Sequence, residues 1–173
     1  MSGEIVTERL ALRPLTGDEA SAVVAGTREG RIWAHDYPTE GDIVVSRLLL
    51  LAPDLPPTDF GTYQVVRRDT GIVVGGVGFK GSPRDGAVEV GYGLAPSARG
   101  AGLATEAVLG LVTFARSRPE IAVVEADTEP GNEASQRVLV RAGFELAGTR
   151  DGRPLFQLTL ADKGVDNGAM EQR

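Results

Sequence analysis

The chain has 173 residues, of which 42% are hydrophobic and 24% charged, with a net charge of −6, one histidine and no cysteine. This composition fits one globular domain, and it excludes disulfides, a thiol nucleophile and thiolate metal sites. The single histidine argues against a zinc site or a serine–histidine pair, so we expect no metal, and the acidic balance argues against nucleic acid as a partner.

The N-terminal segment MSGEIVTERL lacks the basic and apolar regions of a signal peptide. No apolar run approaches the roughly 18 residues that a membrane helix needs. We therefore expect a cytoplasmic protein that does not bind membranes.

The first half of the chain predicts a strand, two helices and a β-hairpin. ERLALRPLT alternates apolar and polar residues as a strand does, and the next segment has early acidic residues and ends on Gly30, as a short helix would. Two β-rich runs flank the turn tripeptide DTG. The expected elements are a strand at 8–16, helices at 17–30 and 39–52, a proline-rich loop at 53–59, and strands at 60–68 and 72–80.

The second half predicts alternating strands and helices and a closing hairpin. Because strands stand on both sides of the helix at 101–117, we expect a parallel crossover inside a mixed sheet. The fold class is α/β (α+β), with a mostly antiparallel sheet of about seven strands flanked by about four helices. One domain spans 1–160, and we expect the polar tail at 161–173 to be flexible. The remaining elements are strands at 87–94 and 121–128, a helix at 132–143, and strands at 144–150 and 154–160.

The stretch RGAGLA at 99–104 places two glycines where a strand gives way to a helix. The first turn of a helix has N–H groups without intrahelical partners, and glycine lets an anion approach them. Arg99 adds a positive charge. Thr105 stands where a dinucleotide motif needs a small residue, and no lysine of a phosphate loop is near. The stretch suits a pyrophosphate; a plain strand-to-helix turn is the alternative.

Three motifs in order give the chain a resemblance to a known family. Arg99, Gly102 and Ala104 match an acetyl-CoA motif, EVGYGLAP precedes it, and NEASQRVLVRAGF follows it. Together they resemble the GNAT superfamily of N-acetyltransferases, in its RimJ/RimL-like branch, from TERLALRPL to PLFQLTL.

The resemblance implies that acetyl-CoA is the co-substrate. Its pyrophosphate would lie on the amides of 99–104, and its pantetheine arm would pair with 92–94 between two splayed parallel strands. Asn132 would contact the pantetheine, and Ser135 would protonate the leaving sulfur, because Leu139 stands where many members have a tyrosine. The implied acetyl-CoA contacts are Tyr92, Gly93, Leu94, Arg99, Gly100, Ala101, Gly102, Leu103, Ala104, Thr105, Asn132 and Ser135.

Glu89 is the candidate base that removes a proton from the amine. On strand 87–94 it shares one face with Gly91 and Gly93, whose missing side chains leave open space. A carboxylate with a purely structural hydrogen bond is the alternative. Ser135 has an alternative too, as a small residue at a helix contact, and Asn132 as a helix cap.

Two weaker signals concern the acceptor. Trp33, His35 and Tyr37 lie in a loop that borders the acceptor in the family, and GGVGF at 75–79 either opens the sheet for the acceptor or relieves crowding. We expect acetyl transfer to a primary amine, either a protein N-terminus or a small molecule, and a homodimer formed near the closing hairpin. The alternatives are a non-catalytic acyl-CoA-binding domain and an unrelated phosphate-binding α/β protein.

Overall fold

The computed structural model describes residues 3–52 and 59–160, which fold around one eight-stranded sheet. The strands are β1 (Ile5–Val6), β2 (Leu10–Pro14), β3 (Thr62–Arg67), β4 (Val73–Phe79), β5 (Ala87–Leu94), β6 (Val123–Asp127), β7 (Glu145–Arg150) and β8 (Arg153–Thr159). The helices are α1 (Gly17–Ala25), α2 (Glu40–Leu51), α3 (Leu103–Arg116) and α4 (Glu133–Arg141), with a 3-10 turn η1 (Pro96–Ala98) before α3. The order across the sheet is β1-β2-β3-β4-β5-β6-β8-β7, and only β5 and β6 run parallel.

The predicted fold class is confirmed. The sheet has eight strands where about seven were expected, and the additional strand β1 is only two residues long and too short to carry a period. The end of one helix was predicted wrongly. Helix α1 ends at Ala25, because Gly26 takes the left-handed conformation with φ 67° and its N–H bonds back to the last turn. Gly30, the predicted end, lies beyond it. Residues 53–58 of the loop predicted at 53–59 and the tail predicted at 161–173 lie outside the described residues.

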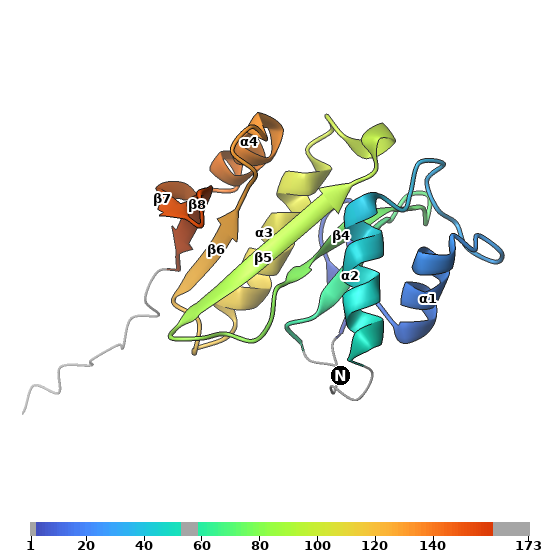
Figure 1. Ribbon diagram of the computed structural model, residues 1–173, viewed down its shortest axis with the longest axis horizontal. Helices are drawn as coiled ribbons and strands as arrows, with labels where there is room; N and C mark the ends of the chain where they lie inside the picture. Colours follow the sequence, from blue (N-terminus) through green and yellow to red (C-terminus); the bar gives the residue numbers. More distant parts are fainter. Residues whose placement is uncertain (1–2, 53–58, 161–173) are drawn as a thin grey trace, which may run out of the picture.

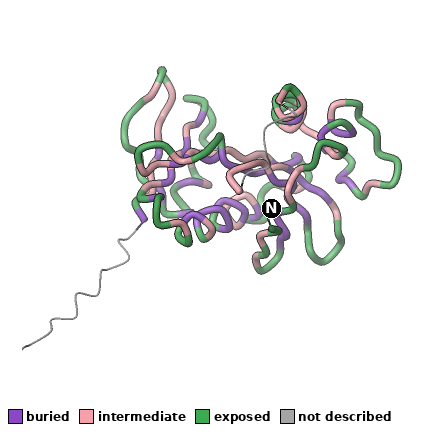
Figure 2. The backbone as a smooth tube through the Cα atoms, turned by 90° about the horizontal axis from the view of Figure 1, so that it is seen from below, coloured by how far each residue is buried: buried purple, intermediate pink, exposed green. Residues whose placement is uncertain are grey.

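The helices form a layer on each face of the sheet (Figure 1). Helices α1 and α2 lie in front of the first half of the sheet, and α3 lies behind it. Inward-facing Val88 and Val90 of β5 and Leu111 of α3 are almost fully buried in one continuous core. Figure 2 shows the buried stretches gathered in the middle of the molecule and the exposed ones in its outer loops.

Helix α2 is packed less tightly than α3. Its N-terminus is fixed by a capping box, in which Thr39 and Asp42 each accept a hydrogen bond from the other's backbone N–H. Along its length only Ser46 is buried, whereas α3 buries seven residues. Space therefore remains between α2 and the sheet.

Strands β5 and β6 pair at one end and separate at the other. Their register contains three pairs, Ala87 with Val123, Val88 with Val124 and Glu89 with Glu125. Strand β5 then continues to Leu94 without a partner on β6. The splayed parallel strands implied by the family resemblance are present, and their open end lies beside the start of α3.

Candidate active site

The loop between β5 and α3 leaves a helix N-terminus open. Gly100 and Gly102 adopt left-handed φ values of 83° and 77°, which turn the chain sharply into the helix. Gly102 is the N-cap residue of α3 and provides no side-chain cap. The N–H groups of the first turn, from Leu103 to Thr105, have no intrahelical acceptor and carry the positive end of the helix dipole. This geometry can bind an anion on backbone amides.

The Arg99 side chain is anchored to the end of β5, and its role as a positive charge at the anion site stays a prediction. Its Nε donates a hydrogen bond to the carbonyl oxygen of Leu94, 3.0 Å away. The guanidinium thus ties the loop to the end of β5, at one of the backbone positions predicted to meet the pantetheine arm.

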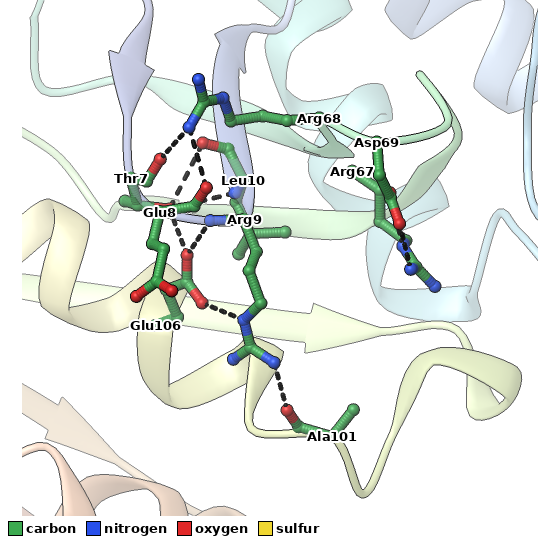
Figure 3. Close-up of polar contacts among 9 residues, drawn as sticks. All are labelled: Thr7, Glu8, Arg9, Leu10, Arg67, Arg68, Asp69, Ala101 and Glu106. Carbon is green, nitrogen blue, oxygen red and sulfur yellow. Dashed lines mark hydrogen bonds and ion pairs between the residues drawn. The ribbon is translucent and has the colours of Figure 1, made fainter.

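A second arginine, Arg9, holds the loop between β5 and α3 in place (Figure 3). From the turn between β1 and β2 its side chain reaches the carbonyl oxygen of Ala101 at 2.7 Å and the Glu106 carboxylate at 2.6 Å. Glu106 also accepts a hydrogen bond from the Thr7 hydroxyl. Burial acts to raise the pKa of Glu106, but the hydrogen bonds from Thr7 and Arg9 outweigh it and lower the net pKa. Arg9 could not be identified as a site residue from the sequence, because no local pattern links it to a helix more than ninety residues away.

Glu89 lies on the face of β5 that the alternation predicted, with Gly91 and Gly93. Its Oε1 lies 2.5 Å from Lys80 Nζ, and its Oε2 lies 2.7 Å from Arg150 Nη2. Arg150 also contacts Glu125 at 3.0 Å, so the charges form one network across several strands. The carboxylate is 23% exposed, and both of its oxygens are engaged by cations. Its role as a base stays a prediction.

Ser135 and Tyr92 bring two hydroxyl groups together at the start of α4. Ser135 Oγ lies 2.7 Å from the Tyr92 hydroxyl, which also donates to the Ser135 carbonyl oxygen at 2.9 Å. Burial raises the pKa of Tyr92, although the hydrogen bond with Ser135 partly opposes it, so the phenol stays protonated at neutral pH. Asn132 caps α4 by accepting the Ser135 N–H. The sequence suggested only the backbone of Tyr92 as a ligand, and Leu139 is fully buried in the core.

A cavity of about 710 Å³ lies between α2 and strands β3, β4 and β5. Its volume is in the range of small-molecule sites. The three loop residues predicted to face the acceptor have different environments. Tyr37 lines the cavity, and Trp33 is 8% exposed and packs edge-on against Tyr37. The His35 side chain is 84% exposed to solvent. The glycines that line the cavity are Gly41, Gly76, Gly78, Gly81, Gly91 and Gly93.

The glycines of β4 and β5 serve two purposes. A Cβ atom on Gly75 would lie 2.2 Å from the carbonyl oxygen of Gly93, so this glycine relieves crowding. A Cβ atom on Gly93 would meet no atom within 4 Å and would project into open space. The GGVGF segment of β4 therefore relieves crowding at Gly75, whereas the open space lies above Gly93 on the neighbouring strand β5.

This contrast gives a prediction for stability. We expect Gly75→Ala to lower the melting temperature markedly, because backbone atoms cannot move aside for the methyl group, with a cost on the order of 1–3 kcal/mol. Gly93→Ala should leave the melting temperature almost unchanged. Thermal unfolding followed by circular dichroism measures both variants, and equal losses would show that the space above Gly93 is not open.

Within the described residues, no group of three or more acidic or histidine side chains could hold a metal ion. None of the helices in the described ranges is long and apolar enough to cross a membrane.

Comparisons with known proteins agree with the motifs. Residues 9–145 match the family model of the acetyltransferase (GNAT) domain. N-acetyltransferase YjdG of Bacillus subtilis is 35% identical over 88 residues, which cover 50% of this chain and 52% of that protein, so the match spans about half its length. N-acetyltransferase YoaA of the same organism is 26% identical over 147 residues, 82% of each protein. The structure of RimL, a ribosomal L7/L12 alpha-N-protein acetyltransferase, in complex with coenzyme A superposes with a TM-score of 0.65 at 19% identity, covering 91% of this chain and 98% of that one.

Proposed function

The chain belongs to the acetyltransferase (GNAT) family, and we propose that it transfers an acetyl group from acetyl-CoA to a primary amine, of a protein N-terminus or a small molecule. One observation carries this proposal: the open end between β5 and β6 lies beside the uncapped start of α3, and a cavity adjoins the same part of β5. One substrate can thus bind along the gap while the other occupies the cavity.

The residues present suit acetyl-CoA. The amides at the start of α3 can donate hydrogen bonds to a pyrophosphate, since Gly100 leaves open space and Gly102 places no side chain beside them. The unpaired backbone of β5 near Gly93 offers hydrogen bonds that an amide-containing arm can take up. The RimL structure of the same fold was solved with coenzyme A, which supports this assignment.

In the proposed reaction the amine nitrogen attacks the thioester carbonyl carbon, so that a C–N bond forms and the C–S bond breaks. The bound thioester supplies the acetyl group. Glu89 takes the proton that the amine must lose, directly or through water, and Ser135 donates a proton or hydrogen bond to the departing sulfur. The Tyr92 hydroxyl, 2.7 Å from Ser135 Oγ, supports the latter role by positioning the serine, while its own proton is donated to the Ser135 carbonyl oxygen.

The experiment that tests this function follows the release of free CoA thiol from acetyl-CoA in the presence of N-terminal peptides and small amines. Thiol release that depends on an amine supports the proposal. The alternative, a domain that binds acyl-CoA without catalysis, has one observation in its favour, since both oxygens of Glu89 already contact cations. Binding of acetyl-CoA without amine-dependent thiol release would favour that alternative.

The sheet edge gives a prediction for assembly. Strand β7 pairs only with β8 among the described strands, and its Leu146 is largely exposed. An open edge strand is a site for pairing, so we expect a homodimer of twice 18.2 kDa, which Leu146→Asp should dissociate. Analytical ultracentrifugation measures the mass, and a wild-type monomer at high protein concentration would reject the dimer.

A further inference from the structure

The cavity between α2 and the sheet is mainly apolar. Its walls include Leu15, Val45, Leu48 and Leu49, and its floor is formed largely by glycines. A peptide chain that enters such a cavity loses water from several amide groups, and each of them needs a new hydrogen-bond partner. An aliphatic or aromatic group needs none, so the lining favours an apolar body over an extended peptide.

Among the residues that the structure describes, two charged side chains line the cavity, and they differ in their partners. Lys80 contacts Glu89 at 2.5 Å and Asp127 at 3.3 Å, so its charge is compensated. Among the described residues, Asp42 has no ion-pair partner. The described part of the lining therefore contains one uncompensated negative charge.

The two oxygens of Asp42 have separate tasks. Oδ2 accepts hydrogen bonds from the backbone N–H and the hydroxyl of Thr39, at 2.8 and 2.7 Å, and so fixes the start of α2. Oδ1 lies over the glycine floor, where a Cβ atom on Gly76 would be only 2.7 Å from it. Burial raises the pKa of Asp42, and the hydrogen bonds from Thr39 only partly oppose this. A desolvated carboxylate oxygen of this kind gains strongly from a cation.

A second observation points to a ligand near Asp42. Ser46 lies one helical turn further along α2, lines the same cavity and is 1% exposed. Its Oγ has no hydrogen-bond partner among the described residues. A buried hydroxyl without a partner costs free energy that a polar group of a ligand can recover.

Gly76 lies between Asp42 and the proposed reaction centre. It pairs with Gly93 on β5, the strand along which the thioester would lie. Adjacent strands are roughly 4.8 Å apart, so Oδ1 of Asp42, lying over Gly76, is close to the place where an amine would attack.

We propose that the acceptor is a cationic amphiphile, a primary amine on an apolar body, and that Asp42 binds its ammonium group in this cavity. The proposal rests on the proposed function, because it takes the cavity as the acceptor site. It assigns recognition of the acceptor to Asp42, a residue outside the family motifs found in the sequence.

The test compares 2-phenylethylamine with its neutral analogue 2-phenylethanol, by calorimetry on the full chain without acetyl-CoA. We expect the amine to bind at least about tenfold more tightly than the alcohol, as a charge-assisted hydrogen bond implies. Asp42→Asn should abolish this preference, because the amide keeps an oxygen for the cap at Thr39 but has no charge. Glu40→Gln is the matched control, since it removes an exposed charge from the same helical turn outside the cavity and should keep the preference.

Equal binding of amine and alcohol by the wild-type protein would overturn the proposal without the need for any variant. A preference that survives in Asp42→Asn would overturn the role of Asp42. Thiol release assays separate this inference from the proposed function. Release with an N-terminal peptide but neither binding nor release with the amine rejects only the inference. Amine binding that depends on Asp42, with no thiol release for any acceptor, supports Asp42 as an ammonium-binding residue but rejects the transferase and, with it, the role of the amine as acceptor.

Discussion

Glu89→Gln is expected to lower turnover by about 10²- to 10⁴-fold near neutral pH, the usual contribution of a general base, with little change in affinity for acetyl-CoA. An amine acceptor is mostly protonated at neutral pH, since a lysine-like amine has a pKa near ~10.4, and only the neutral amine attacks. Part of the lost turnover should therefore return at high pH. The measurement is a pH profile of kcat together with calorimetry of acetyl-CoA binding.

The ion-pair network provides the control for this prediction. Glu125 faces Glu89 across the β5–β6 register and contacts the same Arg150. If Glu89 only balances charge, Glu125→Gln should lower turnover by a similar factor; if Glu89 is the base, Glu125→Gln should have a much smaller effect. Ser135→Ala should lower turnover with little recovery at high pH, because the sulfur gains no proton donor there. Wild-type turnover of Glu89→Gln across the profile would make Glu89 structural.

Gly102→Val should weaken acetyl-CoA binding by at least about tenfold, equivalent to ~1.4 kcal/mol. A Cβ atom on Gly102 would lie 3.4 Å from Arg9 Nη2, so the larger valine side chain would crowd both Arg9 and the start of α3, where the pyrophosphate is proposed to lie on the amides. Gly102 also has a φ of 77°, so valine adds backbone strain on the order of 1–2 kcal/mol. Loss of binding alone therefore does not separate obstruction from instability.

Gly152 is a matched control for that strain. It has a φ of 76° in the turn between β7 and β8, and a Cβ atom there would meet nothing within 4 Å. We expect Gly152→Val and Gly102→Val to lower the melting temperature by similar amounts, while only Gly102→Val weakens acetyl-CoA binding. Equal affinities of both variants and the wild type in calorimetry would remove the α3 amides from the binding site.

Features that depend on local sequence were predicted well. Alternation along β5 placed Glu89 with Gly91 and Gly93, because successive side chains of a strand point to opposite faces. Asn132 was predicted as a helix cap, and its Oδ1 accepts a hydrogen bond three residues on. The end of α1 was predicted wrongly, because Gly26 and Gly30 are equally good stop signals in the sequence.

Contacts between distant segments could not be predicted from local patterns. The Lys80 and Arg150 partners of Glu89 lie nine and sixty-one residues away, and Arg9 meets Glu106 across ninety-seven residues. The aromatic loop shows the same limit. Trp33 and His35 are two residues apart, yet one is buried and the other is exposed, because tertiary packing alone decides which side chain turns inward.

The parting of β5 and β6 gives the sheet a mechanical weak point. Within the described residues, the five-stranded and three-stranded halves share three register pairs at the closed end of the gap, and the ion pairs of Glu89 with Arg150 and of Lys80 with Asp127 join them there as well. At the open end, the hydrogen bond between the Tyr92 and Ser135 hydroxyl groups connects β5 to α4. A ligand that forms hydrogen bonds to both strands along the gap would connect the two halves at the open end as well. Binding in the gap should therefore make the whole sheet more rigid.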